Sequence, residues 1–387
     1  MVIIGFAFIL GMGFSRSFLP ILATQLDPSG VLVGSVTSAW FLARIFIELP
    51  SGILSRRLGR RNLLLSGLAC GSVGALLCAV APSIYVLILG RAIWGLGAGL
   101  FFTNSTTIIL DLFESSVRGR AVGNFRGIEF TGSFIGTPLG AFLAVFLEFR
   151  DIFYITFALT LGTCLLAFLS PGLRQIEKLQ PSNALRRSFT ETIVGLLRNN
   201  RVLVICFGTF SRMFVMQGVM STVFQLYLHQ YLGFSVEVIG VVMSARTAGL
   251  ILATVFAGYL SDRFGREPVI ISGFLIASLC LMLYTQITAF EGIIVTGILD
   301  GVGSGMVSTT LMVLLSDLVE SHEIGSAVGL YRTFMDLGGI IGPIVVMKLF
   351  TDIGHVVPFY VGAGLALGNL GFIAFTWLRT RGNTLAC

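Results

Sequence analysis

Residues Gly258–Arg266 read Gly-Tyr-Leu-Ser-Asp-Arg-Phe-Gly-Arg and separate two long apolar runs. A weaker copy, Gly-Ile-Leu-Ser-Arg-Arg-Leu-Gly-Arg, lies 206 positions earlier at Gly52–Arg60 and is also flanked by apolar runs. Glycine lets the backbone turn tightly and lets two helices approach closely. The two stretches therefore predict a short basic turn between two hydrophobic helices, present once in each half of the chain.

The 206-residue offset extends far beyond these two stretches. It aligns Gly34 with Gly240, Gly95 with Gly301, Gly99 with Gly305, Asp111 with Asp317 and Gly136 with Gly342. Chance does not produce such a series without a gap. Two halves repeated in the same orientation predict two pseudo-equivalent helix bundles related by an axis along the membrane normal.

The composition is that of a membrane protein. Of 387 residues, 55% are hydrophobic and only 11% are charged, which is too apolar for a soluble globular protein. A run of about 20 apolar residues crosses a hydrocarbon core of about 30 Å as a helix. Such runs are predicted near 2–24, 31–53, 62–81, 84–110, 119–147, 151–170, 202–228, 236–260, 268–288, 291–317, 325–350 and 357–378. The period-2 alternation of a membrane barrel is absent from the sequence, so the fold class is an all-α membrane protein with twelve transmembrane helices.

Positive charge recurs in alternate connections, as expected for loops that face the cytoplasm. Arg56, Arg118, Arg174 and Arg263 mark four of these connections. They predict a multi-pass protein of the plasma or cell inner membrane with both termini in the cytoplasm. The polar, Pro-containing stretch 171–200 reads as a cytoplasmic linker between an N-terminal six-helix bundle at 1–170 and a C-terminal six-helix bundle at 201–387.

The chain opens directly in an apolar run. This run has no basic flank and no small-residue cleavage site, so it is not expected to be a removable signal peptide. Comparison with the second half leads us to expect that a short cytoplasmic lead is missing from the start.

Gly258–Arg266 and its copy resemble the signature loop of the major facilitator superfamily, whose members are membrane transporters with twelve helices. The resemblance implies that the loops take part in gating by latching one bundle to the other on the cytoplasmic side. The first copy departs from the family's pattern, with Arg56 where the family has Asp. At the ends of their runs, Asp111 and Asp317 are expected to need a cation from these loops, because a helix C-terminus disfavours a carboxylate. The predicted signature and gating residues are Gly52, Arg57, Gly59, Arg60, Asp111, Gly258, Asp262, Arg263, Gly265, Arg266 and Asp317.

A second resemblance lies in the fifth and eleventh runs. Gly136 with Pro138, and the adjacent Gly342 and Pro343, are similar to the Gly-Pro motif of antiporters in this family. In the fifth run the Pro lies two residues after the Gly, where the motif has them adjacent. The resemblance favours export, and generic close packing of helices in lipid is the alternative interpretation.

Polar residues inside apolar runs are the sharpest functional signal, because a charge in hydrocarbon is costly and by default faces a cavity or a partner. Several are spaced four residues apart and so share one helix face. Helix packing is the alternative for the uncharged members. The predicted residues of a central substrate-binding cavity are Arg16, Trp40, Arg44, Thr103, Asn104, Gln217, Ser221, Gln225, Arg246, Asp300 and Ser304.

Two carboxylates at depth, Glu48 and Asp300, are the candidates for proton coupling. Glu48 and Arg44 are expected roughly 6 and 12 Å above a turn at Gly52, at about 1.5 Å per residue, and a structural ion pair between them is the alternative. Asp300 is either half of a cross-helix ion pair or a proton-binding carboxylate, and Arg246 has no obvious local partner. The excess of Arg over carboxylate makes an anionic solute a candidate, because guanidinium binds carboxylate and phosphate well.

Three arginines at depth have no specific role assigned, although Arg16 is one of the predicted cavity residues. They are Arg16, Arg91 and Arg212, of which Arg91 resembles the family's membrane arginine before Gly-x-Gly in the fourth helix.

The sequence shows no Gly-x-x-x-x-Gly-Lys phosphate loop, no hydrolase motif and no metal-ligand spacing, and its six cysteines form no disulfide framework. We expect no enzyme activity, no cofactor, no metal and no nucleic-acid partner. The expected function is a monomeric secondary active transporter that exports a small organic solute by alternating access, with protons and the lipid bilayer as partners. The alternatives are uptake or facilitated diffusion of a sugar, peptide or organic acid and, from another class, a transport-inactive membrane sensor or a lipid translocator.

Overall fold

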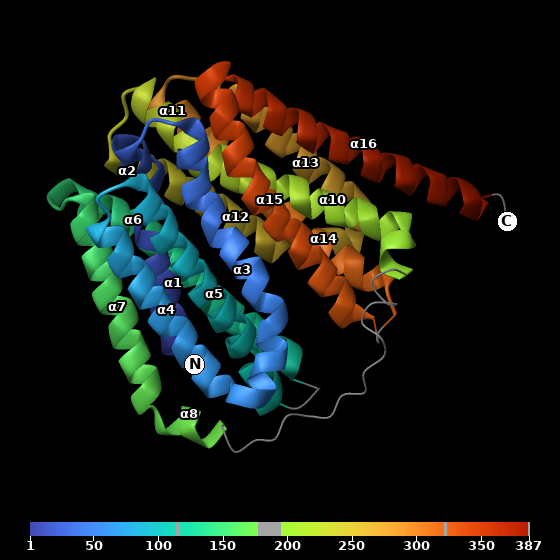
Figure 1. Cartoon of the computed structure of the whole chain (residues 1–387). Coiled ribbons are helices and arrows are strands. Elements are labelled where there is room, and N and C mark those ends of the chain that lie inside the picture. The colour runs from blue at the N-terminus through green and yellow to red at the C-terminus, as the bar shows by residue number, and fades with distance from the viewer. Residues whose placement is uncertain (114–116, 177–194, 321–322, 386–387) are drawn as a thin grey trace. The chain divides into compact units, whose positions relative to one another are not determined.

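In a computed structural model of the chain, the structure describes residues 1–113, 117–176, 195–320 and 323–385 (Figure 1). These residues fold into helices joined by short connections. Contacts divide the chain into two compact units, which are called unit 1 and unit 2 here. Unit 1 is Met1–Ala184 with Leu228–Val241, and unit 2 is Leu185–Tyr227 with Val242–Cys387. Because the linker predicted at 171–200 falls largely on residues outside the described part, the predicted domain boundaries stay a prediction.

Unit 1 is built from long apolar helices. They are α1 (Val2–Phe14), α2 (Leu19–Leu26), α3 (Gly30–Leu58), α4 (Arg60–Val80), α5 (Ile84–Leu112), α6 (Arg118–Phe146), α7 (Phe149–Leu169) and the short α8 (Pro171–Ile176). Local sequence sets some of these starts. Pro20 occupies the first turn of α2, and Glu148 and Asp151 form a capping box at the start of α7.

Unit 2 repeats this plan. Its helices are α10 (Asn200–Phe214), a π-helix (Val215–Val223), α11 (Phe224–Gln230), α12 (Val236–Phe264), α13 (Arg266–Leu283), α14 (Phe290–Leu318), α15 (Ile324–Asp352) and α16 (Val357–Leu385). α11 and α12 cross the boundary between the units, so α12 belongs to unit 2 from Val242 onward. The side chain of Asn199 accepts a hydrogen bond from the Arg201 amide and caps α10.

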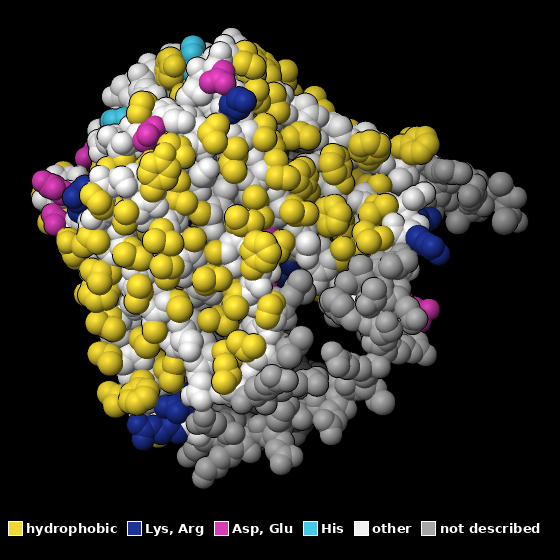
Figure 2. Space-filling model, viewed as in Figure 1, with side chains coloured by type: hydrophobic (Ala, Val, Ile, Leu, Met, Phe, Trp, Pro, Cys, Tyr) yellow, Lys and Arg dark blue, Asp and Glu magenta, His cyan; other side chains and the backbone are white. Residues whose placement is uncertain are grey.

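Eleven segments among the described residues are long and apolar enough to span a membrane, or twelve if the bent pair α1–α2 is one span. Figure 2 shows hydrophobic side chains along the visible helix surfaces, with most charged side chains near the helix ends. Phe46, Phe142 and Phe146 are among the large exposed hydrophobic residues. An apolar surface of this kind suits lipid as the surrounding solvent, and the predicted all-α membrane class is confirmed.

The first predicted span, 2–24, is not one straight helix. α1 ends at Phe14, α2 begins at Leu19, and the two are bent by 46°. The first span of unit 2 is irregular as well, since Val215–Val223 adopts π-helical hydrogen bonding, in which each amide reaches one residue further back. Gly13 and Pro20 flank the first irregularity and Gly218 lies within the second, and the hydropathy of the sequence reveals neither.

The predicted turn at Gly52–Arg60 is shorter than expected. α3 continues as helix through Gly52 to Leu58, and only Gly59, with φ of 81°, reverses the chain before α4. Unit 2 does the same, because Gly265 has φ of 94° between α12 and α13. These are left-handed conformations that only glycine adopts cheaply. The expectation that Glu48 and Arg44 lie 6 and 12 Å from the turn is therefore wrong. Glu48 is eleven residues from Gly59, or about 16 Å along the helix.

The sequence repeat is visible in the helix crossings inside each unit. A side chain at Gly95 would collide with the carbonyl oxygen of Trp40, and one at Gly301 would collide with the carbonyl oxygen of Arg246. Likewise, Gly67 lies against the Gly97 carbonyl, and Gly273 lies against the Gly303 carbonyl. All four contacts obey the 206-residue offset. Small residues at equivalent positions thus set the same close crossings in both units.

The contacts that the first helix of each unit makes do not obey the 206-residue offset. Gly132 and Gly136 of α6 lie against the carbonyls of Phe6 and Leu10. Gly338 and Gly342 of α15 lie against those of Phe210 and Phe214. The offset here is 204 rather than 206, so the second half has two more residues between this crossing and the next span, an interval that contains the π-helix.

Candidate functional site

Arg246 and Asp300 form an ion pair in the interior of unit 2. Gly301 brings the backbones of α12 and α14 together, and this crossing places the two charged side chains side by side. Arg246 Nε lies 2.5 Å from Asp300 Oδ2, and the two side chains are only 9% and 2% exposed. The geometry is that of a charge-assisted hydrogen bond. Of the two interpretations of Asp300, the cross-helix ion pair is therefore present, and a proton-binding role is still open.

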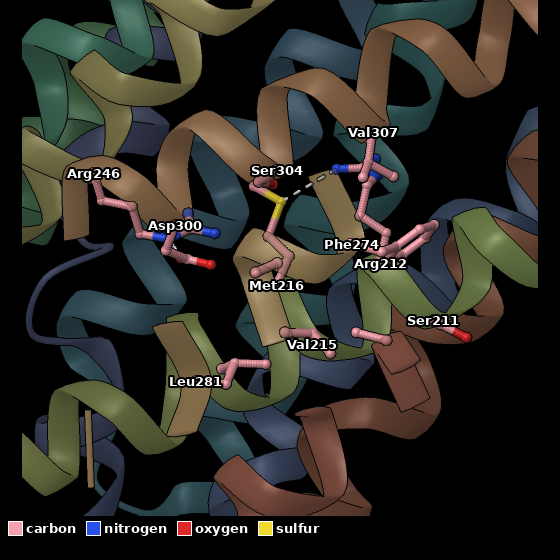
Figure 3. Close-up of a pocket in the computed structure, with 12 residues that line it drawn as sticks. Ser211, Arg212, Val215, Met216, Arg246, Phe274, Leu281, Asp300, Ser304 and Val307 are labelled. Carbon is pink, nitrogen blue, oxygen red and sulfur yellow. Dashed lines mark hydrogen bonds and ion pairs between the residues drawn. The ribbon is translucent and has the colours of Figure 1, made fainter. Parts of the chain in front are cut away.

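A cavity of about 30 Å³ lies beside this pair, large enough for about one water molecule (Figure 3). Ser211, Arg212, Met216 and Ser304 contribute to its lining together with the ion pair. Ser304 is the one further predicted residue that the structure brings to this cavity. The cavity as it stands has room for water and is too small for an organic solute.

The polar groups around this cavity are not all satisfied. Ser211 Oγ and Arg212 Nε are buried and have no hydrogen-bond partner among the described residues. Arg212 Nη1 approaches Met216 Sδ at 3.7 Å, and Figure 3 shows Met216 extending toward Arg212. A thioether sulfur is a weak acceptor for a guanidinium. Arg212 thus retains donors for a ligand or water.

The three predicted residues of the seventh helix do not join this cavity. Gln217 and Ser221 lie half-buried in the π-helix, whereas Gln225 is buried in α11. Thr222 Oγ1 donates to the Gln217 carbonyl, five residues earlier, at 2.8 Å. Gln225 Oε1 is buried without a partner in the part of the chain that the structure describes. π-helical turns are frequent at functional sites, so this segment stays a candidate.

In unit 1, Trp40, Arg44 and Glu48 follow one another along one face of α3. Arg44 Nε lies 3.3 Å from Glu48 Oε1, so the ion pair that was the alternative to proton coupling at Glu48 is present, and the coupling role stays a prediction. The Arg44 guanidinium lies 4.9 Å from the centre of the Trp40 ring, in cation–π geometry. Asn104 Nδ2 donates to Ser51 Oγ at 2.9 Å and so joins α5 to α3.

Two other predicted residues of unit 1 lie apart from this cluster. Arg16 occupies the break between α1 and α2, where its Nη1 donates to Ser133 Oγ of α6 at 2.9 Å. Thr103 is half-buried on α5, and its carbonyl accepts a hydrogen bond from Thr107 at 2.7 Å. A central cavity that combines residues of both units stays a prediction.

The positions of the unit 2 ion pair have aromatic counterparts in unit 1. Under the 206-residue offset, Arg246 corresponds to Trp40 and Asp300 to Trp94. Both tryptophans are nearly fully buried, and neither indole N–H has a partner among the described residues. The same helix crossing therefore carries an ion pair in one unit and two large apolar rings in the other.

The signature loop of unit 2 joins three helix ends through Arg266. This residue pairs with Asp262, donates from Nη1 to Ser261 Oγ at 2.8 Å, and lies 3.2 Å from Asp317 through Nε. The expected cation for Asp317 is thus present within unit 2. The neighbouring Arg263 guanidinium lies 5.4 Å from the ring centre of Phe264, and Gly258 is helical with open space around it. The gating role of this loop stays a prediction.

The loop of unit 1 is only partly described. Gly59 makes the turn, and Arg60 begins α4 in a half-buried position. The side chains at Gly52, Arg57 and Asp111 lie outside the described residues, and their predicted roles stay predictions.

Sequence reasoning did not place three residues at the unit 2 cavity. Ser211 and Met216 have no distinguishing signal, because Ser and Met are common in membrane helices. Arg212 is conspicuous as a charge inside an apolar run, but a role follows only from its position beside Asp300.

Comparison with known proteins gives concordant results. The sequence profile described as Major Facilitator Superfamily matches residues 1–223 and again 205–385. The chain is 26% identical over 391 residues to the multidrug resistance protein MdtG of Citrobacter koseri, covering 98% of this chain and 94% of that protein. It is 25% identical over 375 residues to the quinolone resistance protein NorA of Staphylococcus aureus, covering 94% and 92%.

A solved structure shares the fold. The nucleoside transporter NupG superposes with a TM-score of 0.80 over 96% of this chain and 98% of that chain, at 16% identity. Two profile matches in tandem agree with the paired glycine crossings of the two units. The chain is therefore a multi-pass integral membrane protein that belongs to the Major Facilitator Superfamily of transporters.

Proposed function

We propose that this chain is a proton-coupled secondary transporter that exports a small organic solute by alternating access. The observation that carries the proposal is the Arg246–Asp300 ion pair, which is buried beside a water-sized cavity that also contains Arg212. A buried carboxylate in contact with a small polar cavity is suited to binding and releasing a proton. The relatives named for multidrug and quinolone resistance support export as the direction.

Protonation of Asp300 removes one charge of the pair and leaves Arg246 as an uncompensated buried cation. Such a cation is strongly unfavourable unless water or another acceptor reaches it. The protonation state therefore favours different conformations of α12 and α14, and a difference of this kind can drive a two-state transporter between its states. We assign the main proton site to Asp300 and keep Glu48, paired with Arg44, as the second candidate.

The chemistry of the solute decides whether coupling is antiport or co-transport. A solute group that binds the Asp300 carboxylate competes with the proton, and competition produces exchange of solute against proton. An anionic group that binds Arg246 instead requires Asp300 to be protonated first, which produces movement in the same direction. Because the relatives are named as resistance proteins, we propose exchange of solute against proton. We also propose that the signature loops act as gates and that both termini lie in the cytoplasm.

Transport by the full chain in proteoliposomes tests the proposal. With an acidic interior, a fluorescent quinolone should accumulate inside, and a protonophore that collapses the pH gradient should abolish accumulation. Asp300→Asn should lose this gradient-driven accumulation, and its solute counterflow should be weakened because the carboxylate for which solute and proton compete is gone. The control Asp352→Asn changes an exposed carboxylate at the end of α15 and should behave like the unmodified protein.

Other outcomes would contradict the proposal in different ways. Equal flux with and without the gradient would indicate a facilitator. Accumulation of an organic carboxylate together with protons would indicate uptake. Binding without flux would indicate a sensor, and movement of labelled phospholipid alone would indicate a lipid translocator.

A further inference from the structure

Tyr284 places a hydroxyl group in the interior of unit 2 without a hydrogen-bond partner. Its side chain is fully buried, and its Oη has no partner among the described residues. A buried polar group of this kind costs free energy in the folded state and requires an explanation. The residue stands at the end of α13, where its amide donates to the Cys280 carbonyl at 3.0 Å, so its backbone is held in place.

Two phenylalanines hold the ring of Tyr284. The ring centre of Phe224, in α11, lies 4.3 Å away, and that of Phe359, in α16, lies 6.4 Å away. Both phenylalanines are fully buried. His355 stacks on Tyr227, which contacts Phe359 in turn, so this imidazole joins the cluster through Tyr227. In a close-packed interior such contacts fix a ring, and packing therefore sets the position of the Tyr284 hydroxyl.

Gly297 of α14 borders both this hydroxyl and Arg246. A Cβ atom at Gly297 would have Tyr284 Oη at 3.7 Å and Arg246 Cβ at 3.9 Å among its three nearest neighbours. The hydroxyl and the start of the Arg246 side chain thus flank one point of α14, about one turn before Asp300. Both distances are ordinary contact distances, so the glycine leaves room for a methyl group there. An arginine side chain is long enough to cross this gap and bring its guanidinium to the hydroxyl oxygen.

Arg246 has a carboxylate partner in Asp300 only while that residue is ionised. The other ionisable groups that act on Arg246 are Cys280 and Tyr284, both of α13, and Arg212 lines the cavity beside the pair. A thiol is a weak acceptor, and Arg212 is itself a cation. The Tyr284 oxygen is an unoccupied and better acceptor for the guanidinium.

We propose that Tyr284 is a positioning residue for the Arg246–Asp300 pair, and that its oxygen accepts a hydrogen bond from Arg246 when Asp300 becomes neutral. The role in transport rests on the proposed function. Protonation of Asp300 is less unfavourable if Arg246 finds this acceptor than if its charge is left uncompensated. The unpartnered hydroxyl is then ready for a contact made in the other protonation state, and Gly297 keeps the space for it open.

Thermal unfolding of the full chain in detergent gives a test that does not depend on transport. Tyr284→Phe keeps the ring contacts and removes the unpartnered oxygen, so its Tm at neutral pH should equal or exceed that of the unmodified protein. In the Asp300→Asn background, where a neutral side chain imitates the protonated carboxyl, the same change should lower Tm. This reversal of sign is the expected result, and equal effects of Tyr284→Phe in the two backgrounds would overturn the proposal.

The pH profile of gradient-driven quinolone accumulation tests the role in coupling. Without the acceptor, protonation of Asp300 is less favourable. Tyr284→Phe should therefore move the half-maximal pH by about one unit toward acid, which corresponds to an about tenfold loss in proton affinity. Gly297→Ala fills the gap without a clash, so it should shift the profile in the same direction without a fall in Tm. Tyr85→Phe changes an exposed tyrosine of α5 and should leave the profile intact.

The outcomes separate this inference from the proposed function. If accumulation by the unmodified protein did not depend on the pH gradient, the proposed function would fail, and the sign reversal in Tm would still decide the role of Tyr284. If accumulation depended on the gradient but Tyr284→Phe left its pH profile unchanged, the proposed function would stand and the positioning role would be wrong. A lower Tm of Tyr284→Phe in the unmodified background would show that the hydroxyl is structural, which also overturns the proposal.

Discussion

Arg246 Nε and Asp300 Oδ2 are 2.5 Å apart across the crossing of α12 and α14, where the Arg246 carbonyl also meets Gly301. One residue of α12 thus makes two contacts with α14, one through its side chain and one through its backbone. The ion pair and the close backbone contact therefore share one residue, Arg246. We expect that loss of the ion pair also alters the distance between α12 and α14 at this crossing.

Removing one member of the pair should destabilise the protein more than removing both. Asp300→Leu or Arg246→Leu alone leaves an uncompensated buried partner and should cost about 3–5 kcal/mol. The double variant should recover much of that loss, because replacing a buried ion pair with apolar residues is often close to neutral. A double-mutant cycle on Tm in detergent measures the coupling, and additive effects of the two substitutions would contradict it.

Gly301 should not tolerate even a methyl group. A Cβ there would overlap the Arg246 carbonyl and lie 2.9 Å from the Leu250 amide nitrogen, so Gly301→Ala must push α12 away from α14. The expected cost is about 1–3 kcal/mol. Gly364→Ala in α16 is the matched control, because no atom lies within 4 Å of its Cβ position. Thermal unfolding should show a lower Tm for the first variant and an equal or higher Tm for the second.

The two outer glycines of the Gly258–Arg266 loop should respond differently to the same substitution. Gly265 has φ of 94°, so Gly265→Ala places a side chain in a conformation that costs about 1–3 kcal/mol. Gly258 is helical with open space around it, and Gly258→Ala should be neutral or slightly stabilising. If both variants had the same Tm, the turn at Gly265 would not be strained by a side chain. Solute transport by Gly258→Ala then reports separately on a gating role.

Loss of Arg266 should affect transport more than stability. Its side chain is 25% exposed, and those of its partners Asp262 and Asp317 are 70% and 50% exposed. Exposed ion pairs contribute about 0–1 kcal/mol each and weaken as salt is added. Arg266→Gln should therefore shift Tm only slightly, and less at high salt. A large, salt-independent fall in Tm would indicate that the loop is a structural element rather than a gate.

Much of the fold could be predicted because lipid imposes a simple requirement on sequence. Helical spans satisfy their own backbone hydrogen bonds, so apolar length alone reveals them, and the glycine repeat reveals the two halves. The predicted helix boundaries were wrong at positions where hydropathy does not indicate that a helix bends or ends. α3 continues through Gly52 because a glycine inside a helix does not by itself end it, and hydropathy does not reveal the bend after Phe14 or the π-helical turns.

The candidate site was less accessible to sequence reasoning. Arg246 and Asp300 each stand out as charges at depth, but their pairing depends on the crossing at Gly301 and not on any spacing along the chain. Arg44 and Glu48 are the opposite case, because an i, i+4 spacing on one helix already places the two side chains together. Residues such as Met216 and Ser211 acquire a role only from what surrounds them.

The shared crossing of Trp40 with Gly95, and of Arg246 with Gly301, has a consequence for how such a protein diversifies. The glycines form the same close crossing in both units, while the side chains beside it differ, with Trp40 in one unit and Arg246 in the other. In unit 1 the positions beside the crossing hold the rings of Trp40 and Trp94. In unit 2 the equivalent positions hold the ion pair of Arg246 and Asp300. A crossing fixed by glycine thus carries different side-chain chemistry at equivalent positions of the two units.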